Sequence, residues 1–311
     1  SCGQVALERS GIRVNNYFAS EIDKFAEKIA HKNYPNTDSI GDVNFVSGIQ
    51  LPDIDLILAG SPCQGFSFAG KQLAFDDPRS ALFFEFLRVL NECRRYNPNV
   101  KFLLENVRMK QEYQDIISKY LGVKPVAINS SLVSAQNRYR LYWANWDITQ
   151  PQDKGLVLKD ILVEGYGDSV ADQGTTVKQI NVDKAACLLA RDYKGFGNQA
   201  MTGVRTVARM VGRRINPTTG KRDDYNTDIT PKQRLEPRKD NKSGCLTTVE
   251  KDNLVVEKGT YRPLLPLEME RLQTLPDNYT DGVSNTQRKK MLGNGWTVDV
   301  IVHILKQGGF V

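Results

Sequence analysis

Residues 54–65 read IDLILAGSPCQG, and this stretch decides the fold. Its first seven residues form a short, nearly continuous apolar run, which a glycine and a proline then stop. Such a run is typical of a strand buried in a parallel sheet. The elements expected around it alternate along the chain: strands over residues 14–19, 101–106 and 126–131, and helices over 22–31, 80–96 and 111–120. This alternation predicts an α/β fold, a doubly wound sheet that binds its ligands at the carboxyl ends of its strands.

The composition of the chain excludes several classes of protein. Hydrophobic residues make up 40% and charged residues 25% of the 311 residues, which are ordinary proportions for a globular protein and exclude wholesale disorder. No apolar run approaches the roughly 18–20 residues that a membrane span needs. The five cysteines are scattered without a CxxC pair, and there are only two histidines. We therefore expect no disulfide scaffold, no metal site and a reducing compartment.

The excess positive charge is confined to one part of the sequence. The net charge is +6, from 42 basic and 36 acidic residues. Residues 205–242 alone hold eleven Lys and Arg against five Asp and Glu, which leaves the remaining sequence balanced at 31 against 31. Charge alone leaves two interpretations open: a solvated basic loop or a phosphate-binding surface.

A change in composition divides the chain into three parts. From about residue 165 the sequence becomes rich in Gly, Thr, Asn, Asp, Lys and Arg, and residues 212–224 contain the turn signals Asn-Pro and Thr-Gly. Strong helical patterns return over residues 267–275 and 285–307. We therefore expect a first domain over 1–164, a smaller loop-rich unit inserted over 165–259, and a return to the first domain over 260–311.

Reactive side chains follow the expected strands of the first half. Cys63 comes just after the strand at 54–60, Glu105 ends the next strand, and Arg138 and Arg140 follow the strand at 126–131. Taken singly, a cysteine is more often a core residue, and a glutamate or arginine is usually solvated. Because three strands place such residues at one edge of the sheet, together they indicate a site.

The motifs at these strand ends resemble those of the cytosine-C5 DNA methyltransferase family. SPCQGFS (61–67), LLENV (103–107) and QNRYR (136–140) occur in the family's order, and residues 262–276 (RPLLPLEMERLQTLP) and 291–305 (MLGNGWTVDVIVHIL) look like its last two motifs. The resemblance implies a Rossmann-like methyltransferase sheet, with residues 165–259 as the variable target recognition domain. It also favours the phosphate-binding interpretation of the basic segment.

The resemblance implies a role for each residue at the strand ends. Cys63, held by Pro62, is the expected nucleophile that adds to carbon 6 of a cytosine flipped out of the duplex, since a thiolate is soft and partly ionised near neutral pH. Glu105 is expected to serve N3 of the base, where charge builds up. Arg140 is expected at the base carbonyl, and Arg138 nearer the backbone phosphates.

The implied methyl donor is S-adenosylmethionine, which leaves as S-adenosylhomocysteine. Glu21 is expected to accept the ribose hydroxyls, Ile22 to pack on the adenine, and Asp42 to meet the adenine amino group. The remaining residues expected to line the cofactor pocket are Gly3, Val43, Leu82, Asn294, Trp296 and Val298.

The chain departs from the family pattern at its start. It opens on Ser1-Cys2-Gly3-Gln4, which resembles the end of the family's cofactor loop, without the preceding strand and its aromatic residue. We expect a truncated chain rather than a damaged cofactor site, because nothing else looks degenerate.

The implied partner is double-stranded DNA, read mainly by the basic segment. Arg213, Arg214, Lys221 and Arg222 flank the turn, a shape able to enter a groove, and we expect at least one base-reading residue among them. Gln136 and Arg138 are further expected DNA contacts. The residues expected to contact phosphates only are Arg234, Arg238 and Lys239.

Two alternatives to a DNA methyltransferase stay open. One is a tRNA cytosine-C5 methyltransferase on the same fold, and the other is a catalytically inactive DNA-binding homologue. For the favoured function we expect a monomer in the cytoplasm of a prokaryotic or viral host cell, associated with the nucleoid and without membrane contact. A cognate restriction enzyme is a candidate partner.

Overall fold

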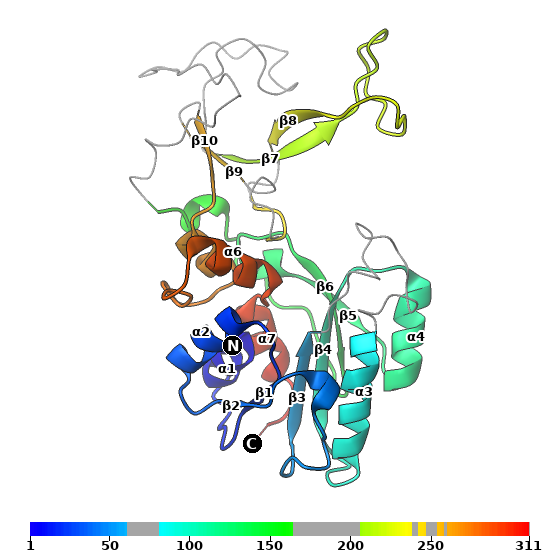
Figure 1. The fold of residues 1–311 in the computed structure, drawn as a ribbon, viewed down its shortest axis with the longest axis vertical. Helices are drawn as coiled ribbons and strands as arrows, with labels where there is room; N and C mark the ends of the chain where they lie inside the picture. The colour runs from blue at the N-terminus through cyan, green and yellow to red at the C-terminus, as the bar shows by residue number, and fades with distance from the viewer. Residues whose placement is uncertain (61–80, 164–205, 238–241, 247–253, 258–259, 311) are drawn as a thin grey trace.

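The computed structural model describes residues 1–60, 81–163, 206–237, 242–246, 254–257 and 260–310. Figure 1 shows a larger part, in which helices flank a central sheet, and a smaller part with an antiparallel sheet of its own. Within the described residues, no helix combines the length and the apolar content that crossing a membrane requires.

The central sheet has four strands in the order β3-β4-β6-β5. β3 (Leu56–Gly60) runs parallel to β4 (Lys101–Val107), whereas β6 (Tyr139–Ala144) runs antiparallel to both β4 and β5 (Val126–Asn129). The strands expected at 54–60 and 101–106 are confirmed. β6 was not among the expected strands, and it makes the sheet mixed. Since β6 is antiparallel, its first residues lie at the carboxyl end of β4.

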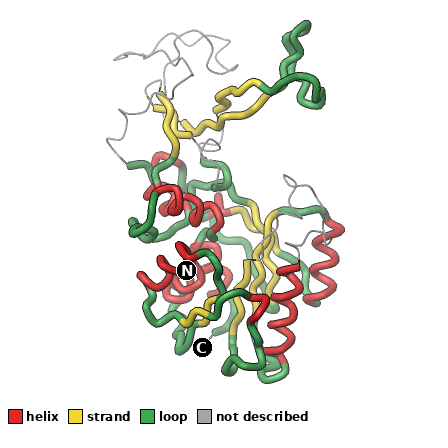
Figure 2. The backbone as a smooth tube through the Cα atoms, in the orientation of Figure 1, coloured by secondary structure: helices red, strands yellow, loops and turns green. Residues whose placement is uncertain are grey.

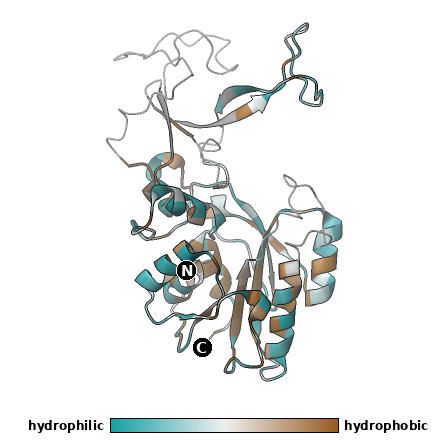
Figure 3. Cartoon of the chain, viewed as in Figure 1, coloured by the Kyte–Doolittle hydropathy of each residue, from teal (hydrophilic) through white to brown (hydrophobic). Residues whose placement is uncertain are grey.

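Both faces of the central sheet are buried, because side chains along each strand alternate between two cores. Phe102, Leu104 and Trp143 pack with α3 (Ala81–Arg94) and α4 (Gln111–Leu121). Leu103 and Tyr142 point the other way, into a core shared with α1 (Cys2–Arg9) and α7 (Val298–Leu305). Figure 3 shows the hydrophobic colour concentrated on these strands. Helices on both faces give the expected doubly wound α/β arrangement.

The N-terminal segment differs from the expectation in its details. Residues 2–9, for which no element was expected, form α1. The strand expected over 14–19 is reduced to β1 (Phe18–Ala19), which pairs in parallel with β2 (Asp38–Ser39); the Asn15-Asn16 pair before it favours a turn. α2 (Lys24–Asn33) begins two residues later than expected because the Asp23 carboxylate caps it, accepting from the backbone N–H of Phe25 at 2.9 Å.

The C-terminal helices pack against the first half of the chain. α5 (Pro266–Leu272), α6 (Asn285–Asn294) and α7 follow the smaller sheet in sequence, and α7 lies against α1. Figure 1 shows α6 and α7, in orange and red, beside the blue N-terminal helices. The described part also contains three short 3-10 helices: η1 (Val43–Phe45), η4 (Ser130–Leu132) and η5 (Leu158–Asp160).

The smaller sheet has the order β10-β9-β7-β8 and is antiparallel throughout. Its strands are β7 (Thr206–Arg213), β8 (Lys232–Pro237), β9 (Leu254–Glu257) and β10 (Thr260–Pro263). β7 and β8 form an arm whose tip extends away from the helices (Figures 1 and 2). The turn expected within 212–224 is present: Ile215 bridges Arg222, and Gly220 has φ +64°, a conformation that glycine adopts without strain.

A buried carboxylate fixes the chain between α5 and α6. Glu270 has no exposed surface, and its side chain accepts from the backbone N–H of Asn278 at 2.7 Å and of Thr280 at 2.8 Å, and also from the Thr280 hydroxyl. Arg288 of α6 pairs with the same carboxylate at 2.9 Å. The Glu270 carboxylate is thus buried with a positive partner and several hydrogen bonds, the condition under which burying a charge is tolerated.

We predict that Glu270→Ala destabilises the fold strongly. The substitution leaves the Arg288 guanidinium buried beside unpaired backbone groups, which costs about 3–5 kcal/mol of unfolding free energy. Urea unfolding measures this, with Glu112→Ala as the control, because the Lys110–Glu112 pair at 3.6 Å is exposed and contributes at most about 1 kcal/mol. Equal losses from the two variants would contradict the prediction.

Candidate active site

Glu105 and Arg140 form an ion pair at the carboxyl end of β4. The Arg140 Nε lies 2.9 Å from the Glu105 Oε1, and the two side chains are 10% (Glu105) and 13% (Arg140) exposed. The strand register explains the contact: Arg140 lies opposite Val107 and Tyr142 lies opposite Glu105, so all four side chains project from the same face. The expectation that strand ends bring this carboxylate and this arginine together is confirmed.

The surroundings of Arg140 favour its charged form. Burial alone would lower the pKa of the Arg140 guanidinium, but its neighbours Cys245 and Glu105 outweigh burial and raise the pKa above its ordinary value. Beneath the pair, burial and then the charge of Glu105 raise the pKa of the Tyr142 phenol. Arg140 is therefore a permanent cation in a partly desolvated position, where its field is stronger than in water.

Arg138 is buried rather than placed at a surface that could meet phosphates. Its guanidinium is directed inward, where it donates to the carbonyl oxygens of Gly295 at 2.8 Å, Gly293 at 3.2 Å and Leu246 at 3.3 Å, and to the Cys245 Sγ at 3.0 Å. Carbonyls that converge in this way satisfy a buried guanidinium. In this structure Arg138 joins three separate segments of the chain.

Gln136 is also buried, although it was expected to contact DNA. Its side-chain oxygen accepts from the backbone N–H of Leu246 at 2.9 Å, and its amide nitrogen lies 3.2 Å from the Gln273 Oε1. Gln273 in turn accepts from the Thr297 hydroxyl at 2.9 Å and donates to the Leu292 carbonyl at 2.6 Å. The Gln136 amide group therefore makes its hydrogen bonds within the protein, as part of a continuous buried network.

Pro62 and Cys63, the expected nucleophile and its neighbour, lie outside the described residues. β3 ends at Gly60, which pairs in register with Glu105. The chain therefore continues towards Cys63 from a point one strand away from the Glu105–Arg140 pair.

The two acidic residues expected to hold the cofactor lie on adjacent loops. Glu21 follows β1 and Asp42 follows β2, and the Ser20 hydroxyl joins the loops by donating to the Gly41 carbonyl at 2.7 Å. One oxygen of Glu21 accepts from the backbone N–H groups of Ile22 and Asp23, each at 2.8 Å, and Asp42 caps η1. Ile22, which directly follows Glu21 in the sequence, is apolar and yet 79% exposed.

The Trp296 ring packs against Gly60, at the end of β3, and lies near Gly3. A Cβ on Gly60 would lie 2.9 Å from the Trp296 Nε1, and a Cβ on Gly3 would lie 2.7 Å from the Tyr17 hydroxyl and 3.9 Å from the Trp296 ring. Neither position has room for a side chain. This close approach puts the indole beside the carboxyl end of β3.

The other expected cofactor residues differ in exposure. Leu82 is half-buried near the start of α3, Asn294 is exposed at the end of α6, and Val43 is half-buried in η1. Val298 has no exposed surface and belongs to the core. In this structure Val298 is a core residue and does not line a surface site.

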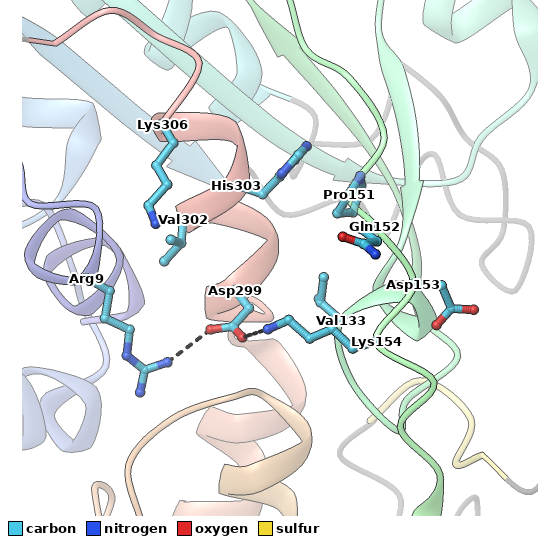
Figure 4. A pocket seen from close by; sticks show the side chains of 10 residues that line it. All are labelled: Arg9, Val133, Pro151, Gln152, Asp153, Lys154, Asp299, Val302, His303 and Lys306. Carbon is cyan, nitrogen blue, oxygen red and sulfur yellow. Dashed lines mark hydrogen bonds and ion pairs between the residues drawn. The ribbon is translucent and has the colours of Figure 1, made fainter.

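A cavity of about 810 Å³ lies elsewhere, between α1, α7 and the segment around Lys154 (Figure 4). Its charges are largely paired with one another: the Asp299 carboxylate contacts Arg9 at 3.1 Å and Lys154 at 2.6 Å. It does not contain the Glu105–Arg140 pair or any residue expected to bind the cofactor. We therefore do not assign the reaction to it.

The four basic residues around the turn of the arm fall into two classes. Arg213 makes a two-pronged ion pair with Glu236, both contacts at 2.6 Å, and Arg214 donates to the carbonyls of Ile229 and Asp224. These two hold the base of the tip together. Lys221 is exposed, and Arg222 is exposed beside Asp224.

Cys245, which touches both arginines, was not expected at the site. Its Sγ accepts from Arg138 at 3.0 Å and from Arg140 at 3.3 Å. It lies more than a hundred positions further along the chain, in a segment without a motif that could have marked it. Only the fold brings it to the site.

With this geometry in place, comparison with known proteins identifies the class. Residues 2–309 match the model of the C-5 cytosine-specific DNA methylase family, and the chain belongs to that family. The resemblance noted in the motifs is thereby confirmed, and with it the class of reaction, methylation of carbon 5 of cytosine in DNA. Among curated proteins, the chain is similar to the type II methyltransferase M.NgoBI of Neisseria gonorrhoeae, at 43% identity over 92% of this chain and 83% of that protein.

Two further similarities extend over most of the chain. The type II methyltransferase M1.ScrFI of Lactococcus lactis subsp. cremoris is 29% identical over 93% of this chain and 70% of its own length. Among solved structures, that of S. pombe Dnmt2 methyltransferase matches with a TM-score of 0.57 at 18% identity, covering 98% of this chain and 94% of that one. The latter shows that the Rossmann-like fold is shared.

We predict that Arg138→Leu lowers stability by several kcal/mol, because each buried acceptor left unpaired costs about 1–3 kcal/mol. Arg108→Leu is the control: Arg108 is exposed over the Tyr139 ring at 5.5 Å, a contact worth about 0.5–1 kcal/mol. The measurement is the unfolding free energy in urea. A wild-type value for Arg138→Leu would show that the buried network is dispensable.

Proposed function

We propose that this methyltransferase attacks carbon 6 of a flipped-out cytosine with the Cys63 thiolate, while Glu105 and Arg140 bind the edge of the base that gains negative charge. The ion pair at 2.9 Å carries this proposal. It is already formed and partly desolvated, so it costs little reorganisation when charge develops on the base.

The chemistry assigns one task to each group. Addition of the Cys63 sulfur to carbon 6 pushes electron density onto N3 and carbon 5 of the base. The Glu105 carboxyl group donates a proton or a hydrogen bond to N3. Arg140 stabilises the charge at the base carbonyl. Once carbon 5 carries the methyl group, a base, for which a water molecule is sufficient, takes the carbon 5 proton. The electron pair of that C–H bond restores the 5,6 double bond as the Cys63–carbon 6 bond breaks, which regenerates the thiolate.

The residues beside β1, β2 and β3 fit S-adenosylmethionine. When bound, this cofactor supplies an electrophilic methyl group, which is the chemistry that the activated carbon 5 requires. Glu21 would accept from the ribose hydroxyls, Asp42 would meet the adenine amino group, and the exposed Ile22 would pack on the adenine ring. The two acidic side chains on adjacent loops and the exposed Ile22 support the fit. Gly60 packs closely against Trp296 and so fixes the indole beside the end of β3.

The alternatives have less support. The curated relatives described above are type II methyltransferases, which favours DNA over tRNA as the substrate. An inactive homologue would not need to maintain a buried glutamate–arginine pair. Double-stranded DNA is thus the proposed partner, in the cytoplasm and at the nucleoid, with a restriction enzyme of the same specificity as a second candidate partner.

The projecting arm is the proposed DNA reader. Lys221 and Arg222 lie exposed on its tip, whereas Arg213 and Arg214 maintain its shape. Bisulfite sequencing of plasmid DNA from cells that express the full protein tests the whole proposal, because it reports both the methylated carbon and the sequence around it.

We predict that DNA containing 5-fluorocytosine at the mapped site traps a covalent complex in the presence of S-adenosylmethionine, because the fluorine cannot leave carbon 5 as the proton does. Cys63→Ala should abolish the complex, as seen in a denaturing gel, and Cys93→Ala, which removes a buried core thiol, should retain it. A persistent adduct in Cys63→Ala would assign the nucleophile to another residue.

For the arm, we predict that Lys221→Ala and Arg222→Ala change DNA binding without changing stability. If the side chain meets a phosphate, its removal lowers the slope of log K against log salt by about one unit. If it reads a base, its removal costs about 1–3 kcal/mol at one base pair only. Lys119→Ala on α4, also exposed, controls for the charge change. Unchanged salt slope and unchanged site preference in both tip variants would remove the arm from DNA recognition.

A further inference from the structure

Cys245 occupies a fixed position against the catalytic sheet. It lies in residues 242–246, which return from the smaller sheet and run beside residues 135–137. The Ser243 N–H donates to the Ala135 carbonyl at 2.9 Å, and the Asn137 N–H donates to the Ser243 carbonyl at 2.8 Å. The Leu246 N–H is held by the side chain of Gln136. These bonds hold the cysteine backbone on both sides, so its sulfur has little freedom to move.

The sulfur is both donor and acceptor in this position. It donates to the Leu246 carbonyl at 3.3 Å, and it accepts from Arg138 at 3.0 Å and from the NH2 nitrogen of Arg140 at 3.3 Å. Arg138 is anchored by three carbonyls besides, so the contact does not determine where Arg138 lies.

Arg140 has fewer contacts than Arg138, and each of its three guanidinium nitrogens meets a different partner. Its Nε pairs with Glu105 at 2.9 Å, its NH1 donates to the Tyr139 carbonyl at 2.9 Å, and its NH2 meets the Cys245 sulfur. A guanidinium is planar, and three contacts at its three nitrogens fix its plane as well as its position. Without the sulfur, the contacts at Nε and NH1 remain, but the NH2 nitrogen loses the contact that helps to fix the plane of the group.

We infer that Cys245 is a positioning residue, which sets the orientation of the Arg140 guanidinium towards the base. This rests on the proposed function of Arg140. In this inference Cys245 acts through Arg140. Because its segment connects β8 with β9, it also joins the arm to the Glu105–Arg140 pair through one side chain.

The test compares Cys245→Ala with Cys245→Ser in the full protein. The single-turnover rate of methyl transfer to plasmid DNA, measured with radioactive S-adenosylmethionine, should fall about tenfold in Cys245→Ala, as expected when a hydrogen bond to a charged group is removed. Binding of S-adenosylmethionine and the thermal midpoint should stay near wild type. Cys245→Ser keeps a donor and an acceptor, and should recover most of the rate.

A double-mutant cycle separates positioning from a structural role. If Cys245 acts through Arg140, Cys245→Ala should have little further effect in an Arg140→Lys background, since lysine lacks the nitrogen that meets the sulfur. An additive loss, a wild-type rate in Cys245→Ala, or a Cys245→Ser variant as slow as Cys245→Ala would overturn the inference. A wild-type protein that methylates no DNA would instead overturn the proposed function.

Discussion

The guanidinium of Arg138 is the group on which the arrangement of the site depends. Removing such a charge from water costs several kcal/mol unless its N–H groups all find acceptors. The acceptors here are carbonyls of Leu246, Gly293 and Gly295, which come from two segments more than a hundred residues further along the chain. The segment that returns from the smaller sheet, the junction between α6 and α7, and the start of β6 are therefore fixed to one another at a single point.

This anchoring determines where the chemistry takes place. Arg140 lies in β6, two residues after Arg138, so its backbone is placed by the same buried contacts. The antiparallel direction of β6 then turns its side chain towards Glu105 on β4, with the end of β3 on the other side. A purely parallel sheet would have put the start of β6 at the opposite edge. The site is thus a consequence of one reversed strand as much as of the residues that it carries.

The elements that could be predicted from the sequence are those with strong local signals. β4 and α4 lie within one residue of the expected bounds, because each is an apolar pattern bounded by polar or turn residues. β6 was missed, since QNRYR gives no alternation that marks its start. The convergence of Glu105 with Arg140 followed from strand order. The burial of Gln136 and Arg138 did not, because it depends on acceptors from distant segments. Counting charges likewise could not show that Arg213 is paired with Glu236.

The ion pairs of Arg213 at the base of the arm affect how much change in length the outer loop tolerates. Arg213 ties β7 to Glu236 on β8 and to Asp224 within the tip, so the hairpin is closed at its base. Once a loop is closed, doubling its length costs only about 0.6 kcal/mol of further closure entropy. Insertions and substitutions in the loop beyond Arg213 and Glu236 therefore cost little folding free energy, and they leave the central sheet unchanged. Changes in the length of the outer loop therefore affect the folding free energy less than changes in the central sheet do.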